Sequence, residues 1–189
     1  MNDDLKNIIN SDLSRWGDGI TKKALIKNLL INPNFKFIYI HRKCNYFRNR
    51  NKLKYVFYRL ILYRLNLKFG FEISNVAQIG KGFKIDHRGA IIINPNTVIG
   101  NNVNVTAGVL IGQENRGGKR GAPVIGNKVW IGANSTIVGK IKIGDNVLIA
   151  PGSYINFDVP SNSIVIGNPG IVKKSLKATE GYIGWILDD

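Results

Sequence analysis

Cysteine is almost absent from this chain, which has Cys44 and no second thiol among its 189 residues. No intrachain disulfide can form, so we expect a reducing compartment, the cytoplasm. The sequence also lacks any run of about 18 apolar residues, and a membrane-spanning helix is therefore not expected. Its first twelve residues, MNDDLKNIINSD, are acidic and polar, which is unlike a secretory signal.

Acidic residues are missing from the segment 19–71, which holds thirteen Lys or Arg and no Asp or Glu. Most of the net charge of +15 therefore belongs to this segment. Three interpretations stay open: a nucleic-acid surface, a peripheral contact with the inner face of a membrane, or the solvated basic face of a cap that packs between subunits. No recognised nucleic-acid motif accompanies the charge, so nucleic acid is the least favoured partner.

Helix-forming patterns fill the part of the chain that carries this charge. Asp18 or Thr21 is placed to cap a helix over 22–31, which ends before an Asn-Pro-Asn stretch. Two further runs mix aromatic with basic side chains: FKFIYIHRKCNYFRN and KLKYVFYRLILYRLNLKF. Helix is the prediction for both, and their β-branched and aromatic content leaves strand as the alternative. We expect a helical N-terminal cap over 1–70.

A six-residue unit restarts again and again from Ile79 to Gly167. An aliphatic residue opens each block, and a small or polar residue usually follows it. A fixed period indicates a solenoid, whose coils bury their apolar sides only against neighbouring coils. Three such units would form one triangular coil with the aliphatic side chains inside, and Gly and Asn would allow the sharp turns at its corners.

The repeat is interrupted twice, by a slip of two residues near Ile91 and by a polar, glycine-rich excursion over 113–123. A loop that projects from a solenoid is commonly found on its functional face. Arg116, Lys119 and Arg120 lie in the excursion, but the spacing of its Gly and Lys residues does not fit a P-loop. The excursion is expected to form one wall of an acceptor cleft or to contact an anionic sugar, with an ordinary solvated loop as the alternative.

One histidine, His87, lies within the repeats. Imidazole exchanges a proton near neutral pH, so His87 is a candidate general base, and a corner histidine without a role is the alternative. Catalytic zinc usually needs three protein ligands, which one repeat histidine does not supply. No metal is expected.

Together these features resemble the hexapeptide-repeat acyltransferases and, among them, the serine acetyltransferases. The resemblance covers roughly 25–174 and rests on these motifs: Asn32-Pro33-Asn34-Phe35, His41-Arg42, Glu72-Ile73, Ile79-Gly80-Lys81-Gly82, Ile85-Asp86-His87 and Gly167-Asn168-Pro169-Gly170. It implies a mainly β fold, a left-handed parallel β-helix with an N-terminal α-helical cap. It also implies acetyl-CoA as acyl donor and a homotrimer. The expected boundaries are 1–70 for the cap, 71–172 for the catalytic β-helix and 173–189 for a tail.

The resemblance also implies catalytic roles. His87 falls on the catalytic histidine and Glu72 on the acid that orients it, with the same fifteen-residue separation. Glu in place of the usual Asp keeps the charge and lengthens the arm. The alternative for Glu72 is a solvated carboxylate at the edge of the repeats.

For the cofactor, the resemblance implies that the pantetheine arm lies in a groove between coils. The matching residues are Gly132, Ala133 and Pro151, with Lys173 or Lys174 near the nucleotide phosphates. Gly112 is a further cofactor-binding candidate, because its backbone N–H, or that of Gly108, could contact the acyl oxygen. Small repeat residues and a solvated lysine turn are the alternative interpretation of these positions.

One departure bears on the acceptor. The Arg-His-Pro stretch that helps to hold the amino acid in serine acetyltransferases is Gly121-Ala122-Pro123 here. Gly and Ala cannot supply a bidentate clamp for a carboxylate. In this respect the chain resembles members that acetylate sugars of capsules or other surface polysaccharides. The predicted function is O-acetylation of a sugar hydroxyl, with serine O-acetylation in cysteine biosynthesis as the alternative and a non-catalytic scaffold as the competing class.

Overall fold

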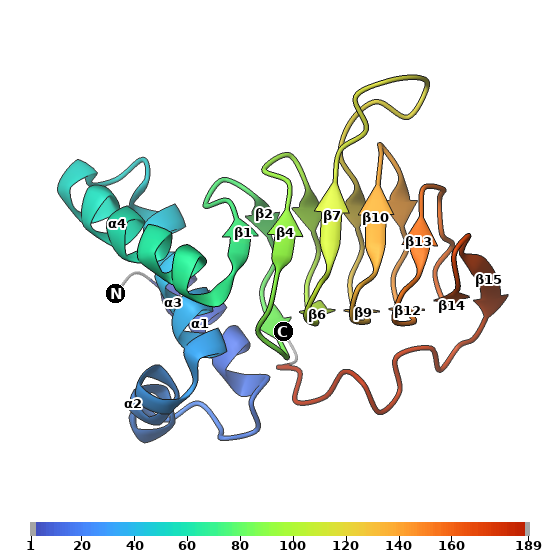
Figure 1. Cartoon of the computed structure of the whole chain (residues 1–189). Coiled ribbons are helices and arrows are strands. Elements are labelled where there is room, and N and C mark those ends of the chain that lie inside the picture. Colours follow the sequence, from blue (N-terminus) through green and yellow to red (C-terminus); the bar gives the residue numbers. More distant parts are fainter. Residues whose placement is uncertain (1–2, 188–189) are drawn as a thin grey trace.

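The computed structural model describes residues 3–187, which form a helical cap followed by a β-solenoid (Figure 1). The cap contains α1 (Asp3–Ser14), α2 (Lys22–Ile31), α3 (Pro33–Phe47) and α4 (Lys52–Phe69). The two runs that mix aromatic with basic side chains are thus helices, α3 and α4, rather than strands. Within residues 3–187, no helix is long and apolar enough to cross a membrane.

Side chains at the helix ends explain where the helices begin and stop. The hydroxyl of Thr21 accepts the backbone N–H of Ala24 at 3.1 Å, so Thr21 rather than Asp18 is the N-cap of α2. Asn32 caps α3 in the same way, and Pro33 occupies the first helical position. Gly70 ends α4 with a φ of 71°, the left-handed conformation that glycine adopts without strain.

The strands form three sheets, which are the faces of a triangular prism. Sheet A contains β1 (Phe71–Ile73), β4 (Ile91–Ile93), β7 (Leu110–Gly112), β10 (Thr136–Val138) and β13 (Tyr154–Ile155). Sheet B contains β2 (Gln78–Ile79), β5 (Val98–Ile99), β8 (Val124–Ile125) and β11 (Lys142–Ile143). Sheet C contains β3 (Lys84–Ile85), β6 (Asn104–Val105), β9 (Val129–Ile131), β12 (Val147–Ile149), β14 (Ser163–Ile166) and β15 (Ile171–Lys174). In Figure 1 the chain rises along sheet A at the front, passes behind and returns below as the coils advance to the right. This path is left-handed, as the resemblance implied.

The residues that open the repeats fill the core of the prism, as the six-residue period predicted. Ile85, Ile111 and Ile131 are fully buried. Phe71 pairs with Ile91, twenty positions later, whereas Ile93 pairs with Ile111, eighteen positions later. The break in the six-residue period near Ile91 therefore arises because the first coil contains two extra residues.

The excursion 113–123 fills the whole connection between β7 and β8 and projects from the prism (Figure 1). Corner residues behave as the composition predicted, since Asn102, Asn134 and Asn162 have φ values of 58°, 58° and 59°. Lys128 takes the same conformation, with a φ of 52°, directly after Gly126 and Asn127.

The cap is fastened to the first coil by two buried side chains of α3. Arg42 donates Nε and Nη2 to the carboxylate of Asp12 at 2.8 and 3.1 Å, and also donates to the carbonyls of Ile79 and Gly80. Burial raises the pKa of Asp12, and Arg42 opposes that rise. The ring Nε2 of His41 lies 3.1 Å from the carbonyl oxygen of Ser74. Burial, followed by the charge of Arg42, lowers the pKa of His41 to about 4, so its ring is neutral at pH 7.

The end of the chain folds back onto sheet C. β15 pairs antiparallel with β14, so Lys173 and Lys174 belong to a strand rather than to a separate tail. Beyond it the chain runs back beneath the prism toward α1 (Figure 1). The ring of Tyr182 packs against that of Trp130 on β9, with 4.7 Å between ring centroids.

Candidate active site

His87 lies on the loop between β3 and β4, at the edge where sheet C meets sheet A, and its side chain is exposed. Gly89, two residues further on, has a φ of 147°, which favours glycine. A Cβ at this position would lie 3.1 Å from the Cβ of Ala107. The His87 loop therefore packs tightly on the Ala107–Gly108 corner of the next coil.

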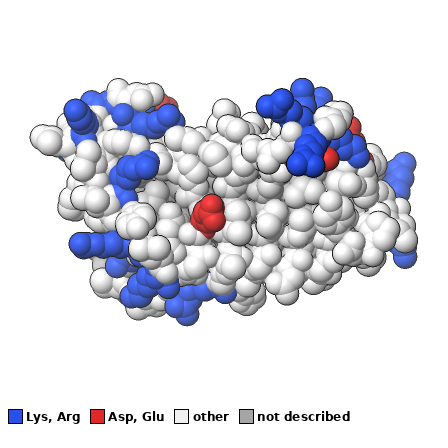
Figure 2. Space-filling view, turned by 45° about the horizontal axis from the view of Figure 1, so that its top comes forward, with Lys and Arg blue, Asp and Glu red and all other residues white. Residues whose placement is uncertain are grey.

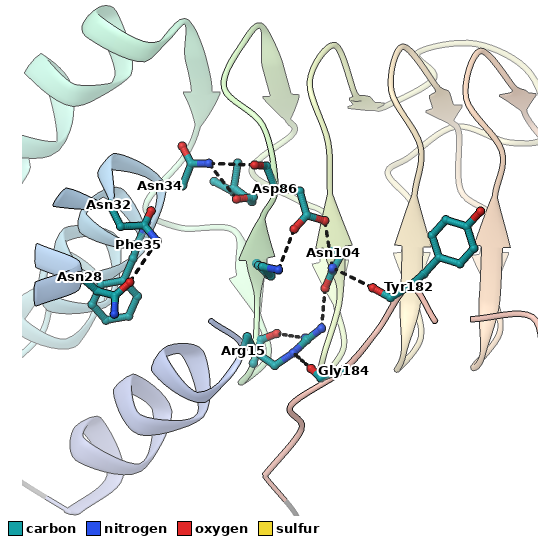
Figure 3. A network of polar contacts seen from close by, with 12 residues as sticks. Arg15, Asn28, Asn32, Asn34, Phe35, Asp86, Asn104, Tyr182 and Gly184 are labelled. Carbon is teal, nitrogen blue, oxygen red and sulfur yellow. Dashed lines mark hydrogen bonds and ion pairs between the residues drawn. The ribbon is translucent and has the colours of Figure 1, made fainter. Parts of the chain in front are cut away.

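Hydrogen bonds from two elements hold Ile85 and Asp86, the two residues before His87 (Figure 3). The amide nitrogen of Asn34, on α3, donates to the carbonyls of Ile85 and Asp86 at 2.9 and 3.3 Å. The amide nitrogen of Asn104, on β6, donates to the Asp86 carboxylate at 3.0 Å. Lys84 forms an ion pair with the other oxygen of Asp86, also at 3.0 Å. The loop is thus held from the cap on one side and from the next coil on the other.

A buried arginine directly after α1 completes this network (Figure 3). Arg15 donates Nη2 to the side-chain oxygen of Asn104 at 2.7 Å, Nη1 to the carbonyl of Gly82 at 2.7 Å and Nε to the carbonyl of Gly184 at 2.9 Å. Burial lowers the pKa of Arg15, and the charges of Asp86 and Asp12 raise it. A guanidinium keeps its proton in proteins, so a fixed positive charge lies behind the His87 loop.

Sequence reasoning did not identify Arg15 or Asn104 as functional residues. A signal for Asn104 exists in the repeat itself. It occupies the outward position of sheet C that Trp130 and Leu148 occupy in later coils, where a buried amide needs partners. No comparable signal marks Arg15, because its partners come from three distant parts of the chain.

Glu72 lies on β1, the first strand of sheet A, with its side chain exposed and Ile92 as its neighbour on β4. β1 begins next to the His87 loop, since a Cβ on Gly70 would lie 3.8 Å from the backbone nitrogen of Ala90. Within the described part of the chain, neither the side chain of Glu72 nor that of His87 has a hydrogen-bond or ion-pair partner. The structure places both on the first coil, and shows no direct bond between them.

Three of the cofactor-binding candidates lie on the same edge of the prism as His87. Gly132 and Ala133 follow β9, and Pro151 follows β12, each where sheet C turns into sheet A. The backbone N–H of Gly152 donates to the carbonyl of Ala133 at 2.8 Å. A Cβ at Gly132 would lie 2.5 Å from the nitrogen of Pro151, so the coils approach here as closely as glycine allows. This edge presents a track of small residues that starts at the His87 loop.

The remaining cofactor-binding candidates lie elsewhere. Gly112 ends β7, at the opposite edge of sheet A, where the excursion begins. The structure therefore does not bring Gly112 to the track of small residues. Lys173 and Lys174 are exposed on β15, the last strand of sheet C, whereas β3 is the first. Five spacings of about 4.8 Å put them roughly 24 Å along the prism from the His87 loop.

The excursion is fastened to the prism at its base and exposed at its tip. Lys119 donates its Nζ to the carbonyl of Asn156, and its own carbonyl accepts the N–H of Lys140 at 2.8 Å. Gly121 has a φ of 136°, and a Cβ there would lie 3.1 Å from the Cβ of Lys140. Arg116 and Arg120 are exposed. Figure 2 shows basic residues gathered at the cap and at the excursion, with a mostly uncharged surface of the solenoid between them.

Among residues 3–187 there is no group of three or more His, Cys, Asp or Glu side chains that could hold a metal ion. The site as described therefore consists of an exposed imidazole, an exposed carboxylate and an edge of small residues. Such a set is suited to proton transfer beside an extended thioester.

The fold and this edge define the chain as a hexapeptide-repeat solenoid. Residues 122–156 match the family described as bacterial transferase hexapeptide (six repeats). The acetyltransferase WcaB of Escherichia coli (strain K12), named for colanic acid biosynthesis, is 41% identical over 135 residues, which are 69% of this chain and 82% of that protein. The chain belongs to the family of hexapeptide-repeat acetyltransferases.

Serine acetyltransferases are also similar to it. Serine acetyltransferase 4 of Arabidopsis thaliana is 41% identical over 106 residues, which are 56% of this chain and 30% of that protein. The chain thus spans about a third of the length of the Arabidopsis serine acetyltransferases that it matches.

Solved structures extend the likeness to the fold. The soybean serine acetyltransferase apoenzyme superposes with a TM-score of 0.74 at 30% identity, covering 89% of this chain and 69% of that one. A serine acetyltransferase of Brucella abortus strain S19 in complex with coenzyme A gives a TM-score of 0.77, covering 92% of this chain and 69% of that one. Its identity of 24% shows a shared fold alone.

Proposed function

We propose that the protein is an acetyl-CoA-dependent O-acetyltransferase that transfers the acetyl group to a sugar hydroxyl of a capsular or other surface polysaccharide, or of its precursor. Membership of an acetyltransferase family supports the reaction. The observation that carries the proposal is the exposed His87, fixed by Asn34 and Asn104 at one end of the track of small residues. A corner histidine without a role would not need this bracing.

In the proposed reaction the acceptor hydroxyl attacks the thioester carbonyl as His87 takes the hydroxyl proton. The tetrahedral intermediate then collapses, the C–S bond breaks, and the thiolate leaves as free coenzyme A after protonation. Glu72 lies on the same coil and stabilises the imidazolium that forms, without needing to lose or gain a proton itself. The backbone N–H of Gly108, at the corner on which the His87 loop packs, is the proposed donor to the oxyanion. Transfer is direct, so no Ser or Cys nucleophile is needed.

The proposed position of acetyl-CoA follows the track of small residues. The pantetheine arm would lie along Gly132, Ala133 and Pro151, at the edge where sheet C turns into sheet A. The nucleotide phosphates would then reach Lys173 and Lys174, whose ammonium groups are exposed. Membership of an acetyltransferase family supports the choice of donor.

The proposed acceptor is a sugar rather than L-serine. Gly121 and Ala122 offer no guanidinium or imidazole to a carboxylate. The exposed Arg116 and Arg120 of the excursion suit an anionic sugar instead. The chain also covers 82% of the relative named for colanic acid biosynthesis, against 30% of serine acetyltransferase 4. Serine remains the alternative acceptor, because that enzyme is equally similar at 41% identity.

A homotrimer in the cytoplasm is part of the proposal. His87 and Glu72 are both exposed in a single chain, and an adjacent subunit on this edge would shield the thioester from water. The absence of a second cysteine supports a reducing compartment.

The test is release of free coenzyme A from acetyl-CoA, with sugar acceptors and L-serine assayed side by side. We expect turnover with a sugar and little with serine. His87→Ala should lower kcat by roughly 10²–10⁴, the usual contribution of a general base. Lys142→Ala, which removes an exposed base from sheet B, serves as the matched control and should leave kcat unchanged. Thiol release from no acceptor would favour the scaffold interpretation, and robust turnover of serine alone would establish the alternative acceptor.

A further inference from the structure

An apolar stripe runs along the outer side of α4. Leu53, Phe57, Leu60 and Leu67 have 84%, 59%, 60% and 68% of their surface exposed, and Tyr63 has 61%. These residues recur at intervals of three, four and seven, so they share one face of the helix. Isolated exposed apolar residues are common, but a stripe along most of an 18-residue helix is not.

The stripe is not the side of α4 that packs on the core, because a different side of the helix does so. Leu62 is only 3% exposed and belongs to the core of cap and solenoid. Tyr58, Leu65 and Phe69 are half-buried against the same core. At 100° per residue these four side chains lie on the side of the helix opposite Leu60. The fold therefore uses one side of α4 and leaves the other without a partner among residues 3–187.

Basic residues border the stripe on both sides. At 100° per residue, Lys52 and Arg59 flank it on one side, Lys54 and Lys68 on the other, and Arg64 lies within it. All five are exposed. Figure 2 shows that Lys and Arg side chains cluster over the cap. No Asp or Glu occurs in the whole segment 19–71 to balance them.

We propose that the outer side of α4 is a docking surface for an anionic lipid membrane. An interfacial helix buries an apolar stripe at the boundary between headgroups and acyl chains, while flanking bases reach the lipid phosphates. The stripe from Leu53 to Leu67 is about 21 Å long at a rise of about 1.5 Å per residue, which suits a flat surface.

A second copy of this chain fits the same surface poorly. Pairing two such stripes would bring like charges together along both borders, with no carboxylate in the segment 19–71 to relieve the repulsion. The charge thus favours an anionic occupant, and the apolar stripe favours one with a hydrocarbon interior. This inference does not depend on acetyl transfer, because binding to vesicles needs no acyl donor.

The test is sedimentation of the full chain with vesicles. We expect it to pellet with phosphatidylcholine vesicles that contain about one third phosphatidylglycerol and to stay in solution with pure phosphatidylcholine. Binding should weaken as salt is raised, because the attraction to the headgroups is screened. Failure to pellet with the anionic vesicles at low salt would overturn the proposal.

Two variants separate a docked helix from simple charge adsorption. Leu53→Gln/Leu60→Gln/Leu67→Gln removes the stripe, retains helix propensity and should weaken binding by about tenfold or more. Lys52→Gln/Lys68→Gln removes flanking charge and should weaken it roughly fivefold for each base. Ile166→Gln/Ile171→Gln, which changes two exposed apolar residues at the far end of the solenoid, is the matched control and should bind like the wild type.

Each remaining outcome decides against the proposal. If the leucine variant binds as tightly as the wild type, the attraction is charge alone and α4 does not insert. If light scattering shows that the leucine variant loses subunits while the wild type never binds vesicles, the stripe is an interface between copies of this chain.

Discussion

Arg15, which directly follows α1, and Asn104 of β6 are joined by a hydrogen bond of 2.7 Å from Nη2 to the side-chain oxygen, across 89 positions of sequence. The same amide donates to Asp86, the residue before His87. Its nitrogen also lies 3.5 Å from the carbonyl oxygen of Tyr182. One amide thus connects the cap, the returning end of the chain and the candidate catalytic loop.

Asn104→Leu should slow catalysis without weakening substrate binding to the same degree. The change leaves Arg15 and Asp86 without their shared partner, so the His87 loop loses its bracing from the second coil. We expect kcat to fall by about 10–100-fold with a small change in KM for acetyl-CoA. Steady-state kinetics measures both values. Equal kcat in variant and wild type would show that the network serves stability alone.

Glu72→Gln should lower kcat by about tenfold or more, because the imidazolium of His87 would form without a nearby carboxylate. Glu72→Asp should recover part of the loss, since it restores the charge on a shorter arm. Glu72 is exposed, so thermal unfolding should be the same for all three proteins. Full activity of the glutamine variant would identify Glu72 as a solvated edge residue.

His41 should make stability depend on pH between about 4 and 6.5. Its pKa is about 4 in the folded chain and 6.5 in the unfolded one, so the unfolded state binds more protons in this window. Stability contributed by the neutral ring is present above pH 6.5 and is lost as the pH falls to 4, by roughly 3 kcal/mol. Urea unfolding across this range measures the loss. His41→Gln keeps an amide near the carbonyl of Ser74 and should lack that part of the pH dependence; identical pH profiles would contradict the assignment.

Gly132→Ala should weaken both the fold and the binding of acetyl-CoA. The new methyl group would lie 2.5 Å from the nitrogen of Pro151, so the two coils must move apart. Overpacking of this kind costs about 1–3 kcal/mol. We expect a lower melting temperature and a raised KM for acetyl-CoA. The control is Gly118→Ala in the excursion, where a Cβ meets nothing within 4 Å. If the Gly132→Ala protein folds and its KM for acetyl-CoA is unchanged, the cofactor does not bind at this edge.

Gly121→Arg/Ala122→His should not confer activity on L-serine. Gly121 has a φ of 136°, a conformation that arginine rarely adopts, so the new guanidinium would come with a distorted excursion. Thiol release with L-serine as acceptor measures the result. Efficient turnover of serine by the double variant would show that two side chains alone separate the two acceptor classes.

The sequence predicted the parts of this protein that depend on local repetition. The aliphatic period located the core residues such as Ile111 and Ile131, and the break in the period located the excursion at 113–123. His87 was conspicuous because a solenoid coil has little need of an imidazole. Each of these inferences depends on residues a few positions apart, which share one coil or one turn.

Tertiary structure alone decided which of these residues meet. Gly132 and Pro151 reach the edge that carries His87 because every coil turns from sheet C to sheet A at the same place, whereas Gly112 reaches the opposite edge. Arg15 and Asn104 are far apart in sequence, and only the packing of the turn after α1 against the second coil makes one a partner of the other. Likewise, α4 has apolar residues on all sides, and only its packing on the core shows which of them remain exposed. The order of the residues determines short-range periodicity. Long-range hydrogen bonds and exposed surfaces depend on how the folded coils and helices pack against one another.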